Sequence, residues 1–211
     1  MNSPLAERMR PKKLDDFIGQ EHLVGPKGVL ASYKDQNLIP SLLFWGPPGV
    51  GKTTLAQLIA KDRPFQQLSA IESGVKEVRA VIQQAKRQDS LFTSQKRTVL
   101  FIDEIHRFSK SQQDALLGAV EKGWITLIGA TTENPSFEVI PALRSRCQLY
   151  ILEPLTKEHL ISILKQAISR DKQLQQKSIV LQETDALLRY SGGDARRLLN
   201  LFELCVHASN S

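Results

Sequence analysis

The chain has 211 residues, which is enough for one domain of ordinary size and a small second one. Its residues are 41% hydrophobic and 24% charged, as is usual for a globular protein. It contains no apolar run of 18 or more residues and no signal-peptide core, which argues against membrane insertion and secretion. A net charge of +6 leans toward an anionic partner, although basic composition alone does not establish nucleic-acid binding. The two cysteines match no disulfide pattern, which indicates reduced thiols, so we expect a cytoplasmic protein. The four histidines are scattered without metal-ligand spacing, so we expect no zinc site.

Apolar runs alternate with helical patterns over the first 154 residues. The sequence predicts strands at 41–45 and 65–70, and buried strands at 98–103, 124–130 and 147–152. Amphipathic helices are expected between them, at 52–61, 73–88 and 109–123. Near-continuous apolar strands that alternate with helices indicate a parallel sheet covered on both faces. We therefore expect a doubly wound α/β domain over residues 1–154.

The pattern changes after Pro154, where only helical periodicity remains. Helices are expected at 155–170, 183–191 and 194–208, and Gly192-Gly193 separates the last two. An all-helical segment of this size after an α/β domain indicates a second, small domain over residues 155–211.

A glycine-rich segment follows the first predicted strand and opens a helix. It reads GPPGVGKT and matches the phosphate-loop pattern G-x-x-x-x-G-K-[ST]. Glycines allow consecutive backbone N–H groups to turn toward phosphates, and the helix N-terminus adds partial positive charge. We expect ATP contacts from Gly46, Pro47, Pro48, Gly49, Val50, Gly51, Lys52, Thr53 and Thr54. Lys52 would reach the β- and γ-phosphates, while the Thr53 hydroxyl would bind Mg²⁺.

Two acids end the strand predicted at 98–103. The carboxyl ends of strands in a doubly wound sheet face the ligand crevice, so Asp103 and Glu104 would lie beside the phosphate loop. Asp103 would hold the Mg²⁺ shell, and Glu104 would orient or deprotonate the attacking water. The second acid indicates hydrolysis, because binding alone needs only Asp103.

With these motifs the sequence resembles the AAA+ ATPases, a P-loop NTPase family with a helical lid. The resemblance implies a polar sensor residue after the fourth strand, where "LIGATTENP" places Thr132, with Asn134 as the alternative. It also implies a lid arginine, and "GGDARRLLN" places this residue at Arg196. A lid cation that contacts γ-phosphate would make lid closure depend on the nucleotide.

The segment "PALRSRC" places two arginines before the last strand, with no acid beside them in the sequence. It resembles the S-R-C box of clamp-loader-type AAA+ subunits, whose arginine serves the neighbouring subunit's site. The resemblance implies that Arg146, with Arg144 as runner-up, lacks a partner in its own chain and completes another protomer's site. Such a finger implies head-to-tail packing in a ring. Clamp-loader relatives carry a further oligomerisation domain, which we expect to be absent from this chain.

The N-terminal segment 4–25, together with 69–79 and 130–139, resembles the replication-associated recombination protein A family. In this group the N-terminal segment covers adenine, which implies base contacts from Ile18, His22 and Leu23. The resemblance also implies a cytoplasmic, nucleoid-associated ATPase at stalled or gapped replication forks, with DNA and single-strand-binding protein as partners.

A second reading of the function stays open. In it the chain is a subunit of clamp-loader or Holliday-junction-motor type that works as a nucleotide-switched binding module. DNA contacts are also open: Lys76, Arg79 and Lys86 share one helix face, which either meets DNA phosphates or is simply solvated.

Overall fold

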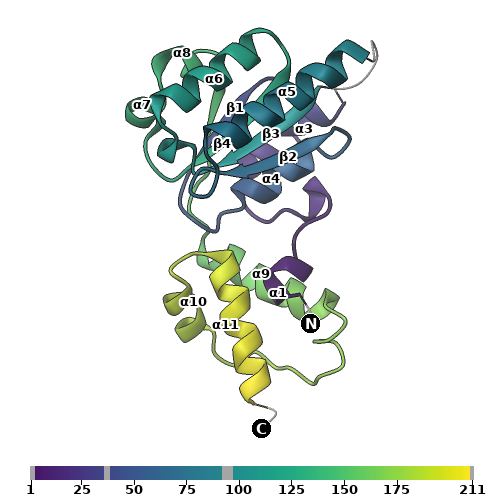
Figure 1. Ribbon diagram of the computed structural model, residues 1–211. Helices are drawn as coiled ribbons and strands as arrows, with labels where there is room; N and C mark the ends of the chain where they lie inside the picture. The colour runs from purple at the N-terminus through teal and green to yellow at the C-terminus, as the bar shows by residue number, and fades with distance from the viewer. Residues whose placement is uncertain (1–2, 36–38, 92–96, 210–211) are drawn as a thin grey trace.

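The structure is a computed structural model that describes residues 3–35, 39–91 and 97–209 (Figure 1). Five parallel strands form one sheet in the order β2-β3-β4-β1-β5. The strands are β1 (Leu42–Trp45), β2 (Phe65–Ser69), β3 (Thr98–Asp103), β4 (Ile125–Thr131) and β5 (Gln148–Ile151). Each lies within two residues of a predicted strand, which confirms the α/β class. The expected burial of the last strand is wrong: β5 lies at the edge of the sheet, and Leu149 and Ile151 are exposed. The crossovers are helical, as parallel neighbours require.

Helices cover both faces of the sheet, because consecutive residues of the central strands β1, β3 and β4 point to opposite faces and are buried on both. Leu42 and Phe44 of β1 join one core cluster with α3 (Val29–Asp35) and α4 (Lys52–Ile59). Leu43 points to the opposite cluster, which includes α5 (Val75–Leu91) and α6 (Lys110–Glu121). Shorter helices complete this part of the molecule: η1 (Leu14–Asp16), α2 (Glu21–Val24), η2 (Ile105–Arg107), α7 (Pro135–Glu138) and α8 (Pro141–Arg144).

A second, helical part lies below the sheet in Figure 1. It contains α9 (Lys157–Arg170), α10 (Asp185–Ser191) and α11 (Ala195–Ala208), close to the three helices expected from the sequence. The N-terminal helix α1 (Leu5–Arg8) packs against α11 in this part. The division of the chain at residue 154 stays a prediction, and in space the start of the chain lies with the lid helices.

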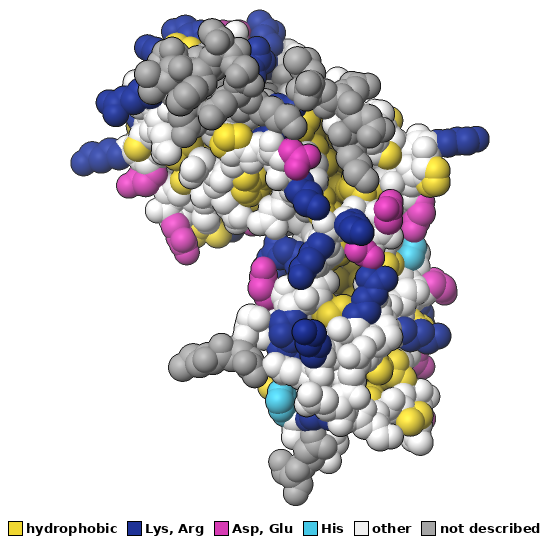
Figure 2. Space-filling model, turned by 90° about the vertical axis from the view of Figure 1, so that its right-hand side faces the viewer, with side chains coloured by type: hydrophobic (Ala, Val, Ile, Leu, Met, Phe, Trp, Pro, Cys, Tyr) yellow, Lys and Arg dark blue, Asp and Glu magenta, His cyan; other side chains and the backbone are white. Residues whose placement is uncertain are grey.

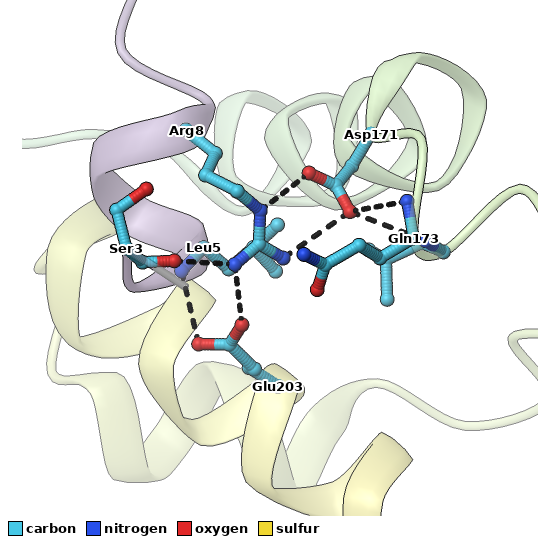
Figure 3. A network of polar contacts seen from close by, with 7 residues as sticks. Ser3, Leu5, Arg8, Asp171, Gln173 and Glu203 are labelled. Carbon is cyan, nitrogen blue, oxygen red and sulfur yellow. Dashed lines mark hydrogen bonds and ion pairs between the residues drawn. The ribbon is translucent and has the colours of Figure 1, made fainter. Parts of the chain in front are cut away.

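A polar network fastens α1 to the lid helices (Figure 3). Arg8 donates from Nε to Asp171 at 2.7 Å and from a terminal nitrogen to Glu203 at 2.9 Å. The backbone N–H of Leu5 donates to the other oxygen of Glu203 at 2.9 Å. Asp171 also accepts the N–H groups of Gln173 and Leu174. The hydrogen bond from Arg8 lowers the pKa of Asp171, and the same contact raises the pKa of Arg8.

The buried side chain of Gln20 holds the connection between the sheet and the lid. Its amide donates to the carbonyl of Glu153 at 2.7 Å and accepts from the N–H of Glu153 at 2.8 Å. The N-terminal segment 4–25, here called the N-terminal arm, is thus tied to the chain just after β5, as well as to the lid. None of the helices in the described ranges combines the length and apolar character needed to cross a membrane.

Candidate nucleotide-binding site

The phosphate loop lies where predicted, between β1 and the first turn of α4. Gly49 and Gly51 have φ angles of +72° and +97°, which strongly favour glycine. A side chain at Gly51 would also place its Cβ 2.5 Å from the ring of Phe17. The two glycines therefore serve the loop conformation and the close approach of the N-terminal arm.

Lys52 is buried at the start of α4, with 7% of the residue exposed. Its Nζ donates to the carbonyl oxygens of Gly46 at 2.6 Å and Pro47 at 2.7 Å. Burial lowers the pKa of Lys52, while Glu104 and Asp103 act in the opposite direction. The ammonium group is thus held by neutral carbonyls, and an anionic phosphate would be a stronger partner.

Asp103 and Glu104 stand at the carboxyl end of β3, as expected. Both line the same cavity as Lys52. Glu104 has a φ of +55°, an uncommon conformation for a residue other than glycine. Its Oε2 accepts a hydrogen bond from the Thr132 hydroxyl at 3.3 Å and lies 3.2 Å from Nδ1 of His106. The residue after β3, the residue after β4 and a histidine of η2 therefore meet at this carboxylate.

The cavity has a volume of about 510 Å³ and opens between the sheet and the lid. Its lining combines the N-terminal arm, the loop from Pro48 to Thr54, the two acids and the lid helices. The size lies within the range of small-molecule sites. A glycine cradle, a desolvated lysine, a threonine hydroxyl and a carboxylate are the groups that a nucleoside triphosphate and Mg²⁺ require, so the residues present fit both. On the face in Figure 2, Lys and Arg side chains gather around the waist between the two parts.

The N-terminal arm forms one wall of the cavity. Ile18 lines it, together with Phe17, Met9 and Arg10, for which no role was expected. His22 and Leu23 are not among the described lining residues. Nε2 of His22 lies 3.0 Å from the carbonyl of Ile151, and Leu23 is buried in the core. The adenine contacts stay predictions. No sequence pattern marks Met9 or Arg10, because their position depends on the arm folding back.

The first residues of α11 approach the phosphate loop from the lid. Arg196 lines the cavity, as its predicted role requires. The N–H of Ala195 contacts the carbonyl of Gly49 at 3.3 Å. A Cβ at Gly49 would lie 2.2 Å from the carboxylate of Asp194, the N-cap of α11. The lid therefore touches the loop directly at a point that leaves no room for a side chain.

The structure separates the two alternatives for the sensor after β4. The Thr132 hydroxyl contacts Glu104, as described above. The Asn134 side chain instead accepts from the N–H of Ser136 and caps α7. Thr132 is thus the alternative that lies beside the Glu104 carboxylate, and its role as sensor stays a prediction.

Arg146 does not lack a partner in its own chain, contrary to expectation. Its guanidinium lies 3.1 Å from the carboxylate of Glu121 and donates to the Ser145 hydroxyl at 3.1 Å. Glu121 is 25 residues earlier in the sequence, at the end of α6, and only the fold brings it close. Arg144 donates to the carbonyl of Ser136 at 2.7 Å. Neither arginine is among the described residues that line the cavity.

The family model described as "ATPase family associated with various cellular activities (AAA)" matches residues 42–155. Replication-associated recombination protein A of Haemophilus influenzae is 46% identical over 208 residues, which cover 96% of this chain and 46% of that protein. The protein of the same name from Escherichia coli K12 is 45% identical, over 95% of this chain and 45% of its own length. ATPase WRNIP1 of Dictyostelium discoideum is 43% identical over 98% of this chain and 24% of its own.

A solved structure of a variant of RuvB from Thermotoga maritima has a similar fold, with a TM-score of 0.73 and 33% identity. The match covers 92% of this chain and 64% of that one. The present chain spans about half the length of the recombination proteins it matches.

Proposed function

Because this chain belongs to the AAA family of ATPases, we propose that it binds ATP with Mg²⁺ in the cavity between sheet and lid and hydrolyses the γ-phosphate. The observation that carries this proposal is the convergence of Lys52, Asp103 and Glu104 on one cavity beside a glycine cradle. A cavity built for binding alone would not need the second acid.

Each group has a role that follows from its position. The backbone N–H groups of the loop hold the phosphates, and Lys52 exchanges its two carbonyl partners for the β- and γ-phosphates. Thr53 and Asp103 would hold Mg²⁺, which supplies charge neutralisation at the transferred group. Glu104 accepts a proton from water while the water oxygen bonds to the γ-phosphorus. The bond from that phosphorus to the bridging oxygen then breaks, which leaves ADP and phosphate. Arg196, on the lid, contributes a cation to the same cavity.

Arg146 is proposed to complete the site of a neighbouring copy. It lies outside its own cavity, and its contact with Glu121 joins side chains that are 52% and 44% exposed. Exposed ion pairs of this kind contribute only about 0–1 kcal/mol, so a neighbour's γ-phosphate can replace Glu121 at little cost. Packing of this type is head-to-tail and builds a ring when the rotation closes.

The physiological role we propose is maintenance of DNA at stalled or gapped replication forks, in the cytoplasm and in association with the nucleoid. The support is the similarity to proteins named replication-associated recombination protein A, along nearly the whole of this chain. We propose DNA and single-strand-binding protein as the partners in this role. The alternative is a nucleotide-switched binding module of clamp-loader or junction-motor type. The position of Glu104 on the cavity favours hydrolysis over a pure switch.

The test is steady-state ATP turnover as a function of protein concentration, with and without gapped DNA. Turnover per mole that rises with concentration and is lost in Arg146→Ala, but not in Arg144→Ala, supports completion in trans. The Glu104→Gln chain should bind ATP yet turn it over at least about 100-fold more slowly. Tight binding by a wild-type chain that never turns over ATP would favour the binding module. ATP turnover per mole that does not change with protein concentration would refute the role of Arg146.

A further inference from the structure

His106 contacts the catalytic carboxylate, although no sequence motif marks it for a role. It lies in the short helix η2, and its side chain is 12% exposed. Its Nδ1 lies 3.2 Å from Oε2 of Glu104 and 3.0 Å from the hydroxyl oxygen of Thr131. His106 is not among the described residues that line the nucleotide cavity, so it acts on the site through Glu104.

The hydrogen bonds of Thr131 determine which ring nitrogen carries the proton. Thr131 is fully buried, and its hydroxyl donates its single proton to the carbonyl of Glu133 at 3.1 Å. The same oxygen accepts the N–H of Glu133 at 3.0 Å. Because the hydroxyl has no second proton, the contact with His106 requires Nδ1 to be the donor. The Glu104 oxygen accepts the Thr132 hydroxyl proton and acts as an acceptor here as well. Nδ1–H is therefore shared between Thr131 and Glu104.

We propose that His106 is the positioning residue for the catalytic carboxylate, held by Thr131 at the end of β4 and holding Oε2 of Glu104. The inference rests on the proposed ATP hydrolysis. With His106 and Thr132 both on Oε2, the other oxygen of Glu104 is left to accept the proton of the attacking water. The arrangement also supports the left-handed backbone of Glu104, a conformation that persists only where its surroundings enforce it.

Three substitutions of His106 separate positioning from structural support. In His106→Asn the amide nitrogen is bonded to Cγ, as Nδ1 is, so a donor remains in place. His106→Gln keeps a polar side chain of similar size but moves its amide away from that position. His106→Leu removes every donor. We expect kcat to fall about 10–100-fold in His106→Leu and by nearly as much in His106→Gln, because small misplacements of a catalytic group are costly. His106→Asn should retain kcat within about threefold, and KM for ATP should change little in all three.

The measurements are kcat, KM, nucleotide binding and thermal unfolding of each variant, with Glu104→Gln as reference. If His106→Leu does not fold, the comparison of the Asn and Gln variants decides. Equal loss of kcat in these two, unchanged turnover in His106→Leu, or a change confined to KM would overturn the positioning role. A wild-type chain without turnover would remove the proposed function and this inference with it. Turnover that depends on Glu104 but tolerates His106→Leu would overturn the inference alone.

Discussion

Replacement of Arg8 by alanine would test whether the N-terminal helix is held mainly by the network in Figure 3. The side chains of Arg8 and Asp171 are only 16% and 5% exposed, and Glu203 is 18% exposed. Breaking a fully buried ion pair costs about 3–5 kcal/mol, and an exposed one contributes about 0–1. Asp171 keeps its two backbone N–H donors in the variant, which limits the penalty. We therefore expect the free energy of unfolding to fall by about 2–3 kcal/mol in Arg8→Ala, because the poorly solvated carboxylate of Asp171 loses its cation.

The assay is urea unfolding of the nucleotide-free chain, with thermal unfolding as a second measure. The expected loss corresponds to a fall in Tm of about 4–12 °C for a chain of this size. The matched control is Arg170→Ala. Arg170 also joins the lid to the arm, but through an exposed ion pair with Asp16 at 2.7 Å. This variant should lose less than about 1 kcal/mol. Equal losses in the two variants would refute the argument from burial.

Three further predictions concern the loop, the arm and acid stability. Gly51→Ala should lower the free energy of unfolding by about 2–4 kcal/mol, because the new Cβ meets the Phe17 ring and φ stays positive. The control is Gly192→Ala, where φ is +62° but the space is open, and its free energy of unfolding in urea should fall by only about 1 kcal/mol. Gln20→Ala should lose about 2–3 kcal/mol in the same assay, since two backbone groups of the connection to the lid lose their partner. The pKa of Asp171 is lowered from 3.8, so its ionised form stabilises the fold above about pH 4 and that contribution is lost as the pH falls through the lower, folded value. The stabilities of wild type and Arg8→Ala, measured from pH 7 to pH 2, should therefore converge in acid, and a constant difference would contradict this.

The sequence predicts the sheet and the position of the glycine-rich loop well because both depend on local patterns. Buried parallel strands are continuous apolar runs, and the loop requires glycine and lysine at fixed spacing within one short segment. Asp103 and Glu104 are placed correctly because the end of a parallel strand faces the crevice in any doubly wound sheet. The resemblance to the replication-associated recombination protein A family is likewise confirmed by relatives of that name.

The contacts that the sequence does not predict join residues far apart in the chain. Glu121 reaches Arg146 because α6 ends near the segment before β5, although the two residues are 25 positions apart in the sequence. His106 meets Thr131 because β3 and β4 are neighbours in the sheet. The arm lines the cavity through residues with no motif of their own, such as Met9. Each of these positions depends on tertiary packing, which no local spacing encodes.

The attachment of α1 to the lid also has a consequence for the order of folding during synthesis. Asp171 and Glu203 follow Arg8 by 163 and 195 residues. At roughly 5–20 residues per second, a ribosome needs about 10–40 s to make Glu203 after Arg8. Throughout that interval α11, the helix that packs against α1, is incomplete, although Leu5 is fully buried in the finished fold. The N-terminal arm is therefore synthesised early but can dock fully only after α11 has been made. The wall that the arm contributes to the nucleotide cavity is completed at that late stage.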